Sequence, residues 1–282
     1  MTETSRKTDL PVLLPMRRLH GDGFAFCLKP WHALPILLIC FFYSAVGFAT
    51  TVPAKETVFD TLLRWMPLLL KGFVFNLAIS MMAMAIGTLS GLVLGLGQIS
   101  LRMSVRRLSW FVTQFFRNAP WLVLLFFAMF LLPFEIKIGG FAIPLPDWLK
   151  ATFGLSLPVM ANVSEIVRGA VKSLPSGQWE AAESLAYTRR QTLWLIILPQ
   201  CIKRMLPPWM NLYSILTMAT VLASIVGVSE VMTLTGRVLS SEGGRPELLA
   251  PFYSFVLLLF FAYCYPIARW TVRLEKKYEV IT

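Results

Sequence analysis

Long apolar runs separated by short polar segments dominate the chain. A helix that crosses the hydrocarbon core of a membrane, about 30 Å thick, needs about 20 predominantly apolar residues. Six stretches fit this pattern: 33–52, 72–101, 108–134, 151–168, 206–229 and 248–268. The fourth is the weakest, because its charge-free part ends at Ser164 and it must continue past Glu165 to reach Arg168. The pattern predicts six transmembrane helices.

The composition agrees with a chain dissolved mostly in lipid. Hydrophobic residues make up 56% of the 282 residues and charged residues only 15%, against about 25% charged residues in soluble domains. Backbone polar groups in lipid must be satisfied within the protein, which leaves helical bundles and closed barrels. Barrel strands would alternate over segments of about 10 residues, unlike the continuous runs here. The predicted fold class is therefore an all-α integral membrane protein.

Basic residues are divided unequally between the two sides of the predicted spans. If the N-terminus is cytoplasmic, 18 of the 26 Lys and Arg residues lie on the cytoplasmic side and 7 on the other, with Arg117 inside the membrane. Cytoplasmic loops carry the excess of basic residues, so both termini are expected in the cytoplasm. The net charge of +11 then faces anionic lipid at the inner surface and calls for no nucleic acid.

The ends and the external loops can be assigned from composition. Segment 1–32 is polar and basic, and we expect a cytoplasmic tail there. We interpret 33–52 as a retained transmembrane helix. The alternative, a cleaved signal peptide, is weaker because 32 residues precede the apolar run, which is long for a secretory signal. Segments 133–150 and 236–250 contain Gly and Pro clusters and are expected to be external loops.

The cytoplasmic loop between the fourth and fifth spans has more structure than a connector needs. A turn at Pro175-Ser176-Gly177 precedes a run of good helix formers from Gln178 to Tyr187. Glu180 and Glu183 lie near the start of this run, where the helix dipole favours acidic side chains. We expect a second short helix over 193–198, ended by Pro199.

Three alanines give this loop a predicted small-residue strip. Ala181, Ala182 and Ala186 are expected on one face of the first loop helix, where they would let another backbone approach closely.

The loop resembles the EAA loop of ABC importer permeases. That pattern is E-A-A, three residues, Gly, nine residues, Ile, one residue, Leu-Pro. Glu180-Ala181-Ala182 matches it, and Ile197 with Leu198-Pro199 nearly matches. Ala186 stands where the family has Gly. Since alanine disfavours a positive φ, we expect the bend there to be tighter or shifted.

The surrounding residues narrow the resemblance to the polar amino-acid permeases of the histidine, glutamine and glutamate type. The similar segments are Lys71-Gly72-Phe73 leading to Ile79-Ser80, Arg117-Asn118-Ala119-Pro120 in place of the family's R-G-T-P, Glu165-Ile-Val-Arg168-Gly169, and Gly177-Gln178-Trp179-Glu180. The resemblance covers about 68–272. It implies a five-helix type I permease core with its EAA loop at 173–200, an extra helix at 33–52 in front and a cytoplasmic tail at 273–282.

The resemblance implies a permease subunit of an ATP-driven amino-acid importer in the bacterial cytoplasmic membrane. Its partners would be two ATP-binding subunits, a second permease subunit and an external substrate-binding protein. ATP and Mg²⁺ would lie on the ATP-binding subunits, because this chain has no G-x-x-x-x-G-K-[ST] motif; no cofactor and no catalytic residue are expected here. The residues implied in coupling to the ATPase are Gly177, Gln178, Trp179, Glu180, Ala181, Ala182, Ala186, Leu198 and Pro199.

Polar residues at membrane depth are candidates for the translocation path, with helix–helix hydrogen bonding as the alternative role. They are Asn76, Ser80, Arg117, Asn162, Thr217, Thr220 and Ser224. Arg117 would lie about 15 Å into its helix from Arg107, and a structural ion pair is the favoured role for it. Glu165 and Arg168, three residues apart, are expected to pair on one helix face.

One departure from the family bears on the substrate. Where the family typically has Lys-Asp-Thr-Ser in the fifth span, this chain has Met218-Ala219-Thr220-Val221. If those charges hold the substrate, this subunit lacks them, and we expect a heterodimer in which the partner permease keeps them.

Two other classes of protein are less consistent with the sequence. A secondary transporter would show inverted repeats with broken helices. A membrane-embedded enzyme would show paired Asp, His or Cys residues within the spans, and the four Cys residues are scattered without a metal-binding spacing. No metal site is expected.

Overall fold

The structure is a computed structural model that describes residues 57–138 and 141–278. The elements in chain order are α2 (Val58–Gln98), α3 (Met103–Asn118), α4 (Trp121–Leu131), β1 (Glu135–Ile138), β2 (Phe141–Pro144), α5 (Asp147–Lys172), α6 (Gly177–Ser184), α7 (Arg189–Gln191), the π-helix η2 (Thr192–Ile197), α8 (Leu198–Ala219), the 3₁₀-helix η3 (Thr220–Ser224), α9 (Val231–Ser241) and α10 (Pro246–Tyr278). The predicted tail 1–32 and extra helix 33–52 lie outside the described residues. Much of the predicted tail 273–282 is the end of α10.

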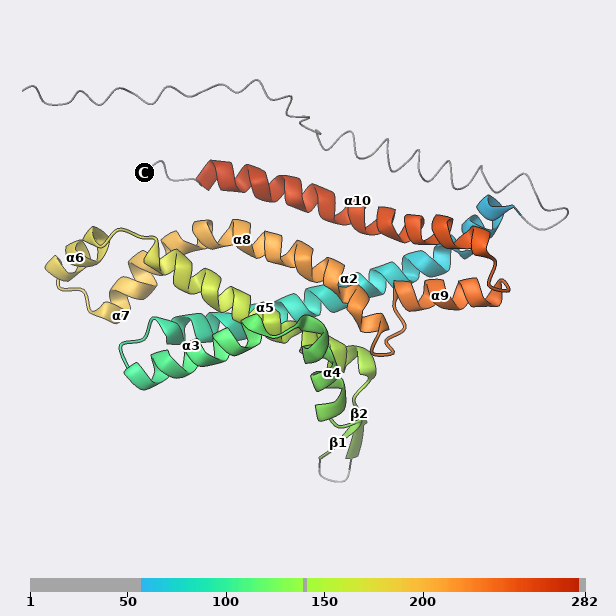
Figure 1. Cartoon of the computed structure of the whole chain (residues 1–282). Helices are drawn as coiled ribbons and strands as arrows, with labels where there is room; N and C mark the ends of the chain where they lie inside the picture. The colour runs from blue at the N-terminus through green and yellow to red at the C-terminus, as the bar shows by residue number, and fades with distance from the viewer. Residues whose placement is uncertain (1–56, 139–140, 279–282) are drawn as a thin grey trace, which may run out of the picture. The chain divides into compact units, whose positions relative to one another are not determined.

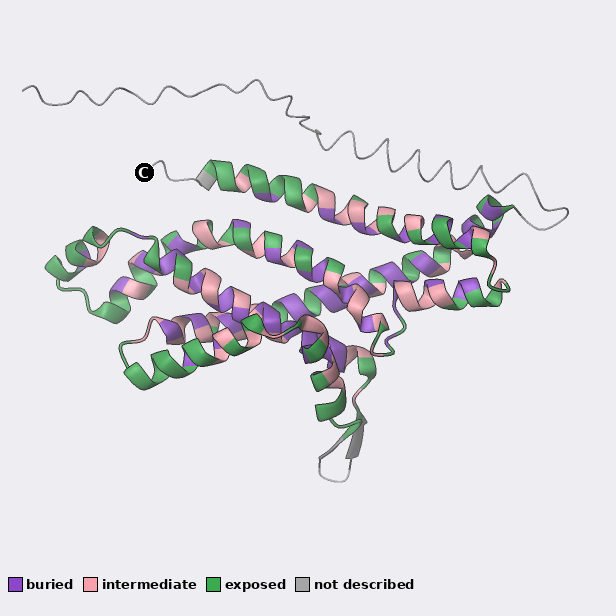
Figure 2. Ribbon diagram, in the orientation of Figure 1, coloured by how far each residue is buried: buried purple, intermediate pink, exposed green. Residues whose placement is uncertain are grey.

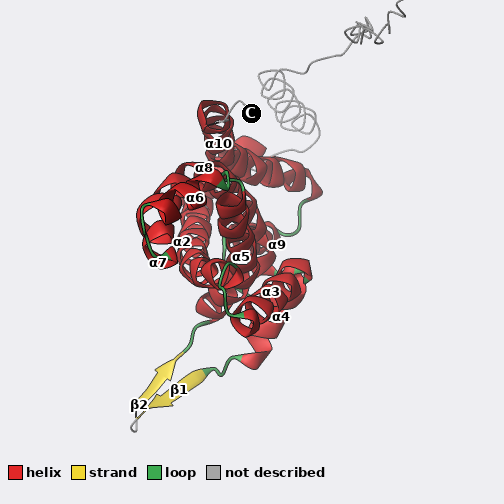
Figure 3. Cartoon of the chain, turned by 90° about the vertical axis from the view of Figure 1, so that its left-hand side faces the viewer, coloured by secondary structure: helices red, strands yellow, loops and turns green. Residues whose placement is uncertain are grey.

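The described part of the chain is helical apart from one β-hairpin and the connecting turns (Figures 1 and 3). The hairpin lies within the predicted external loop 133–150, and its antiparallel strands pair Glu135 with Pro144 and Ile138 with Phe141. The sequence analysis expected only a loop here. The all-α class is confirmed for the helices, and the hairpin is an addition to it.

The predicted spans correspond to helices of unequal character. By length and composition, α2 and α10 can each cross a membrane, and α3 with α4 can form a third span that is bent by 106°. Helices α5 and α8 occupy the positions of the fourth and fifth predicted spans, but a larger share of their residues is polar. The predicted number of six spans is not confirmed by the described residues.

The predicted span 108–134 is broken into two helices at Ala119-Pro120. Ala119 has an extended backbone, with φ −77° and ψ 137°. Proline disfavours the helical conformation of the residue before it and lacks the N–H that a helix interior requires. The chain therefore leaves α3 and begins α4 in a new direction, so a single straight helix was the wrong expectation.

Helices α2 and α5 pack most closely in the described structure. Gly87, Gly91 and Gly95 of α2 face valines of α5, because a Cβ built on each glycine would overlap Val159, Val163 and Val167 in turn. Small residues at a four-residue spacing let two membrane helices approach until their backbones touch.

Two apolar clusters fill the interior. One joins α2, α5 and α8 around Leu155 and Leu216. The other joins the first half of α2 to α9 and α10 around Leu69 and Phe252. Buried residues face neighbouring helices and exposed residues lie on the outer faces, many of them large and apolar (Figure 2). Such outward apolar faces are expected where lipid surrounds the helices.

The end of α9 is tied to the first turns of α2 by a carboxylate outside the predicted spans. Glu242 accepts a hydrogen bond from Trp65 Nε1 at 2.8 Å and pairs with Arg64. The Trp65 hydrogen bond and the Arg64 charge hold the pKa of Glu242 below its ordinary value. This contact stabilises the fold above the ordinary pKa of a glutamate and weakens as the pH falls through the lowered value.

We predict that Gly91→Ala destabilises the protein by about 1–3 kcal/mol, because overpacking forces the backbones apart. The new Cβ would lie 2.6 Å from the carbonyl oxygen of Met160 and 2.7 Å from Cβ of Val163. Thermal unfolding in detergent, followed by circular dichroism, measures the change. Gly236→Ala in α9 is the matched control, since its Cβ would meet nothing within 4 Å. An unchanged unfolding temperature for Gly91→Ala would contradict the close packing.

Candidate functional site

The structured loop between α5 and α8 lies at one end of the described bundle (Figure 1). Helix α6 buries Ala182, which is only 2% exposed, while Glu180 and Glu183 face outward. Trp179 and Leu193 pack against a buried cluster at the end of α5 and the start of α8. The loop is therefore held from the membrane side and presents an acidic face on the other.

Helix α6 ends three residues earlier than predicted, in a Schellman motif. The Tyr187 N–H donates to the Ala182 carbonyl at 3.1 Å, and the Ala186 N–H donates to the Glu183 carbonyl at 2.9 Å. These bonds require a left-handed residue after the helix, and Ala186 supplies it with φ +59°. The expectation that alanine would avoid a positive φ here is wrong.

The left-handed conformation costs a non-glycine residue roughly 1–2 kcal/mol. The hydrogen bonds that satisfy the last carbonyls of α6 offset that cost at Ala186. Because Ala186 lies beyond the helix and Ala181 is exposed, the predicted strip of three alanines on one face is not formed.

The second half of the loop is a continuous helical path from α7 through η2 into α8. Thr188 caps α7 in a capping box with Gln191, which satisfies otherwise free backbone groups. Pro199 lies in the first turn of α8. The prediction that Pro199 ends a helix is therefore wrong. A proline is tolerated in the first turn of a helix, where its missing N–H is no loss, and the wide π turn of η2 precedes it.

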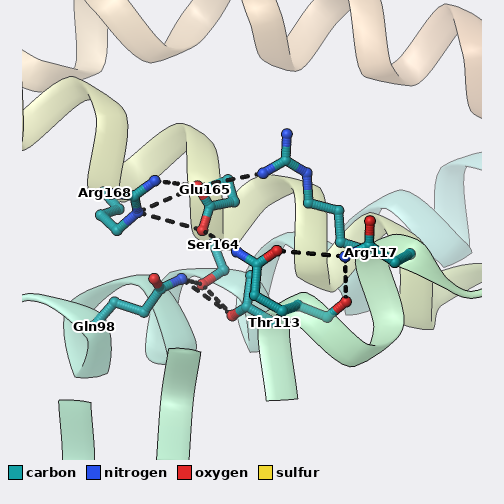
Figure 4. Close-up of polar contacts among 8 residues, drawn as sticks. Gln98, Thr113, Arg117, Ser164, Glu165 and Arg168 are labelled. Atoms are coloured by element: carbon teal, nitrogen blue, oxygen red, sulfur yellow. Dashed lines mark hydrogen bonds and ion pairs between the residues drawn. The ribbon is translucent and has the colours of Figure 1, made fainter. Parts of the chain in front are cut away.

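A second group of predicted residues meets where α3 and α5 cross. In Figure 4, Glu165 lies between Arg168 of its own helix and Arg117 of α3. The Nε atom of Arg168 donates to Glu165 Oε2 at 3.2 Å, and Arg117 Nη1 lies 3.5 Å from the same oxygen. The Glu165 side chain is 12% exposed. One carboxylate therefore pairs with two guanidinium groups, which leaves the group of three with one net positive charge.

A buried polar network joins this pair to α2. Gln98 Nε2 donates to Ser164 Oγ at 2.8 Å and to Thr113 Oγ1 at 3.1 Å, and the two hydroxyls lie 3.0 Å apart (Figure 4). The sequence analysis missed these three residues. The three residues meet only because α2, α3 and α5 pack together, and no local sequence motif indicates the contact.

A cavity of about 590 Å³ opens beside the Glu165 pair, between α3, α5 and α8. Its polar lining includes Arg117, Asn162, Glu165, Arg168, Arg204 and Asn211. Guanidinium groups suit a carboxylate, a carboxylate suits an ammonium group, and amides suit either. The cavity therefore has the groups needed to hold a small charged molecule.

The remaining candidates for the translocation path have other partners. Ser80, Thr217 and Ser224 donate to backbone carbonyls of their own helical segments at 2.7–2.9 Å. Asn162 donates to the Pro158 carbonyl at 2.8 Å and also lines the cavity with Arg117. Of the seven candidates, Arg117 and Asn162 line this cavity.

Asn76 and Thr220 belong to a different buried cluster. Asn76 Nδ2 donates to Glu230 Oε2 at 2.8 Å and to Thr220 Oγ1 at 3.0 Å, and Asn76 Oδ1 accepts from the Val231 N–H at 3.1 Å. Glu230 is fully buried and caps α9 through the Thr233 N–H at 3.0 Å. This cluster joins α2 to η3 and α9. Asn76 and Thr220 therefore have the alternative role given above, hydrogen bonding between helices. The sequence analysis missed Glu230 because it lies one residue beyond the predicted fifth span.

The fold and the loop define an integral membrane subunit of a transport system. The family profile described as "Binding-protein-dependent transport system inner membrane component" matches residues 87–279. The chain belongs to this family, among the permeases of amino-acid ABC transporters, which confirms the resemblance inferred from its motifs.

Individual proteins similar to this chain are also permeases of amino-acid ABC transporters. The "Probable amino-acid ABC transporter permease protein YckA" of Bacillus subtilis is 35% identical over 79% of this chain and 95% of that protein. The "Inner membrane amino-acid ABC transporter permease protein YhdY" of Escherichia coli is 31% identical over 74% of this chain and 56% of that protein. A crystal structure of "an amino acid ABC transporter with histidines" has the same fold, with a TM-score of 0.67, 22% identity, and coverage of 81% of this chain and 100% of that one.

We predict that Ala186→Gly stabilises the end of α6 by about 1 kcal/mol, because glycine adopts φ +59° without strain. The Tyr187 amide, which bonds to Ala182, should exchange its hydrogen roughly fivefold more slowly. Hydrogen exchange of the loop peptide measures this. Ala181→Gly is the control, and it should speed exchange because glycine weakens an exposed helix interior. Faster exchange in Ala186→Gly would argue against strain at this residue.

Glu165→Gln should lower the stability of the protein by about 1–2 kcal/mol, since it leaves Arg117 and Arg168 without their carboxylate. The value is well below that of a fully buried pair, because the two arginine side chains are 46% and 30% exposed and solvent screens them. Thermal unfolding in detergent at low and high salt measures the loss, which should shrink with salt. Glu183→Gln, on the exposed face of α6, should change nothing.

Proposed function

We propose that the chain forms half of the translocation path of an ATP-driven amino-acid importer and is coupled to an ATP-binding subunit through the loop 173–200. The observation that carries the proposal is the loop itself. Its acidic face, with Glu180 and Glu183, points away from the protein, while Trp179 and Ala182 hold it against the ends of α5 and α8. An exposed, stiffly held helix suits docking into a groove of a partner.

The same helices carry the loop and line the cavity. Arg204 of α8 donates to the carbonyl and the hydroxyl of Ser173 at the end of α5, at 2.7 and 2.9 Å. A displacement of α6 therefore moves α5 and α8 together. Because these helices also carry Asn162, Glu165 and Asn211, movement at the loop changes the cavity. This supports coupling by rigid-body motion of packed helices.

The proposed assembly contains two ATP-binding subunits, a second permease subunit and a substrate-binding protein outside the cell. Both termini lie in the cytoplasm of a bacterium, and the chain spans the inner membrane. ATP and Mg²⁺ are held by the ATP-binding subunits, and this chain contributes no cofactor. The permease relatives named for amino-acid transport support the substrate class.

The second permease is proposed to be a different chain. Met218, which is 51% exposed, and Ala219 occupy positions that are charged in the resembled family. A partner with both charges would supply the missing groups. A neighbouring permease sequence that also lacks both charges would refute the heterodimer and indicate a less polar substrate.

The coupling proposal predicts that Glu180→Lys reduces amino-acid uptake and substrate-stimulated ATP hydrolysis at least tenfold, because the charge of the docking face is reversed. Membrane insertion should persist, since Glu180 is exposed. The measurement is uptake and ATPase activity of the reconstituted complex, across a panel of amino acids. Glu275→Lys, on α10 outside the loop, makes the same change of charge and should keep activity. Normal uptake by Glu180→Lys would refute coupling through α6.

A further inference from the structure

A second cavity, of about 530 Å³, lies between the membrane helices and the coupling loop. Its walls come from the end of α2, the start of α3, the end of α5 and the loop helices α6 and α7. None of the residues assigned to the cavity beside Glu165 lines it. It is therefore separate from the cavity beside Glu165, although Trp179 of the loop lines it.

Three cations and no acidic residue line this cavity. They are Arg106, Lys172 and Arg189, and no ion pair involves any of them within the part of the chain that the structure describes. Arg189 lies over the Trp179 ring, 4.9 Å from its centroid, which holds the guanidinium in place. Three positive charges that line one cavity without a counter-charge repel one another and favour the binding of an anion there.

The same cavity also has apolar lining. Ile99, Val171, Leu174 and Leu193 are its apolar lining residues, and Val171 and Leu174 belong to the buried cluster below the loop. A free inorganic anion would gain nothing from such a lining. A phospholipid would place its phosphate among the cations and its glycerol and upper acyl chain along the apolar side chains. The cavity also lies where α2 and α5 end and α3 begins. In the predicted topology this is the cytoplasmic surface of the membrane, where basic residues face anionic lipid headgroups.

Gln98 adds a polar feature to the deep side of the cavity. It is 5% exposed, its Nε2 is bonded to Ser164 and Thr113, and its Oε1 has no hydrogen-bond donor. A buried amide oxygen without a donor is costly. This oxygen is itself buried, so it does not determine which headgroup the cavity takes.

We propose that this cavity binds one anionic phospholipid, for which phosphatidylglycerol serves as the probe. The lipid joins the α2–α3 turn, the end of α5 and the coupling loop at the inner membrane surface. The interaction goes beyond the proposed transport function and does not depend on the identity of the substrate.

The test measures lipid binding to the purified transporter complex by native mass spectrometry during titration with phosphatidylglycerol. The pocket variant is Arg106→Gln/Lys172→Gln, and both side chains are exposed, so the fold should persist. The matched control is Arg107→Gln/Arg190→Gln, which removes the same charge from residues that do not line the cavity. Phosphatidylcholine with the same acyl chains and soluble glycerol phosphate form the other two arms.

We expect the unmodified complex and the control variant to retain one phosphatidylglycerol that the pocket variant binds on the order of tenfold more weakly, since each cation near anionic lipid contributes about 1 kcal/mol. Phosphatidylcholine should not occupy the site, and glycerol phosphate should not compete. Equal lipid binding by the pocket variant and the control overturns the proposal. Effective competition by glycerol phosphate overturns the lipid assignment in favour of a soluble anion. Loss of the ATP-binding subunits from the pocket variant, with lipid binding unchanged, assigns the cations to the partner protein.

Discussion

The close approach of α2 and α5 is the constraint on which the rest of the described structure depends. Gly87, Gly91 and Gly95 of α2 contribute no side chain to the contact, and valines of α5 occupy the space that a side chain would need. Association of helices in lipid gains little from the hydrophobic effect, so tight van der Waals packing must supply much of it. The contact fixes both the rotation and the height of α5 relative to α2, and therefore determines which polar residues meet.

The buried polar groups follow from that contact. Gln98 lies three residues beyond Gly95 and reaches Ser164 on α5, which also aligns Ser164 with Thr113 of α3. At the other end of α2, Asn76 holds Glu230 and the start of α9. Each group would be costly if left unpaired in a low-dielectric interior. The networks thus favour one arrangement of helices over others with similar apolar packing.

The sequence predicted the features that depend on local pattern. The apolar runs located α2 and α10, and a turn followed by a run of good helix formers predicted a structured loop before α8. Pro120 and the Gly and Pro residues of segment 133–150 are turn signals in the sequence. The long apolar run around Pro120 nevertheless suggested one continuous span, and segment 133–150 was interpreted as a loop without strands. Glu230 and Gln98 could not have been found in this way, because their importance comes from partners more than 60 residues away on other helices.

Two of the errors in the loop between α5 and α8 have a common physical origin. Ala186 and Pro199 were each judged by the intrinsic preference of the residue, which disfavours a positive φ for alanine and a continuing helix around proline. Such preferences amount to a few kcal/mol at most. In the loop, the Schellman hydrogen bonds of α6 and the packing of Trp179 and Leu193 on the buried cluster act on the same short segment. The combined stabilisation from these contacts exceeds either intrinsic preference, so the contacts determine the backbone conformation. The loop therefore keeps its bend with Ala186 at the position where the EAA pattern has glycine.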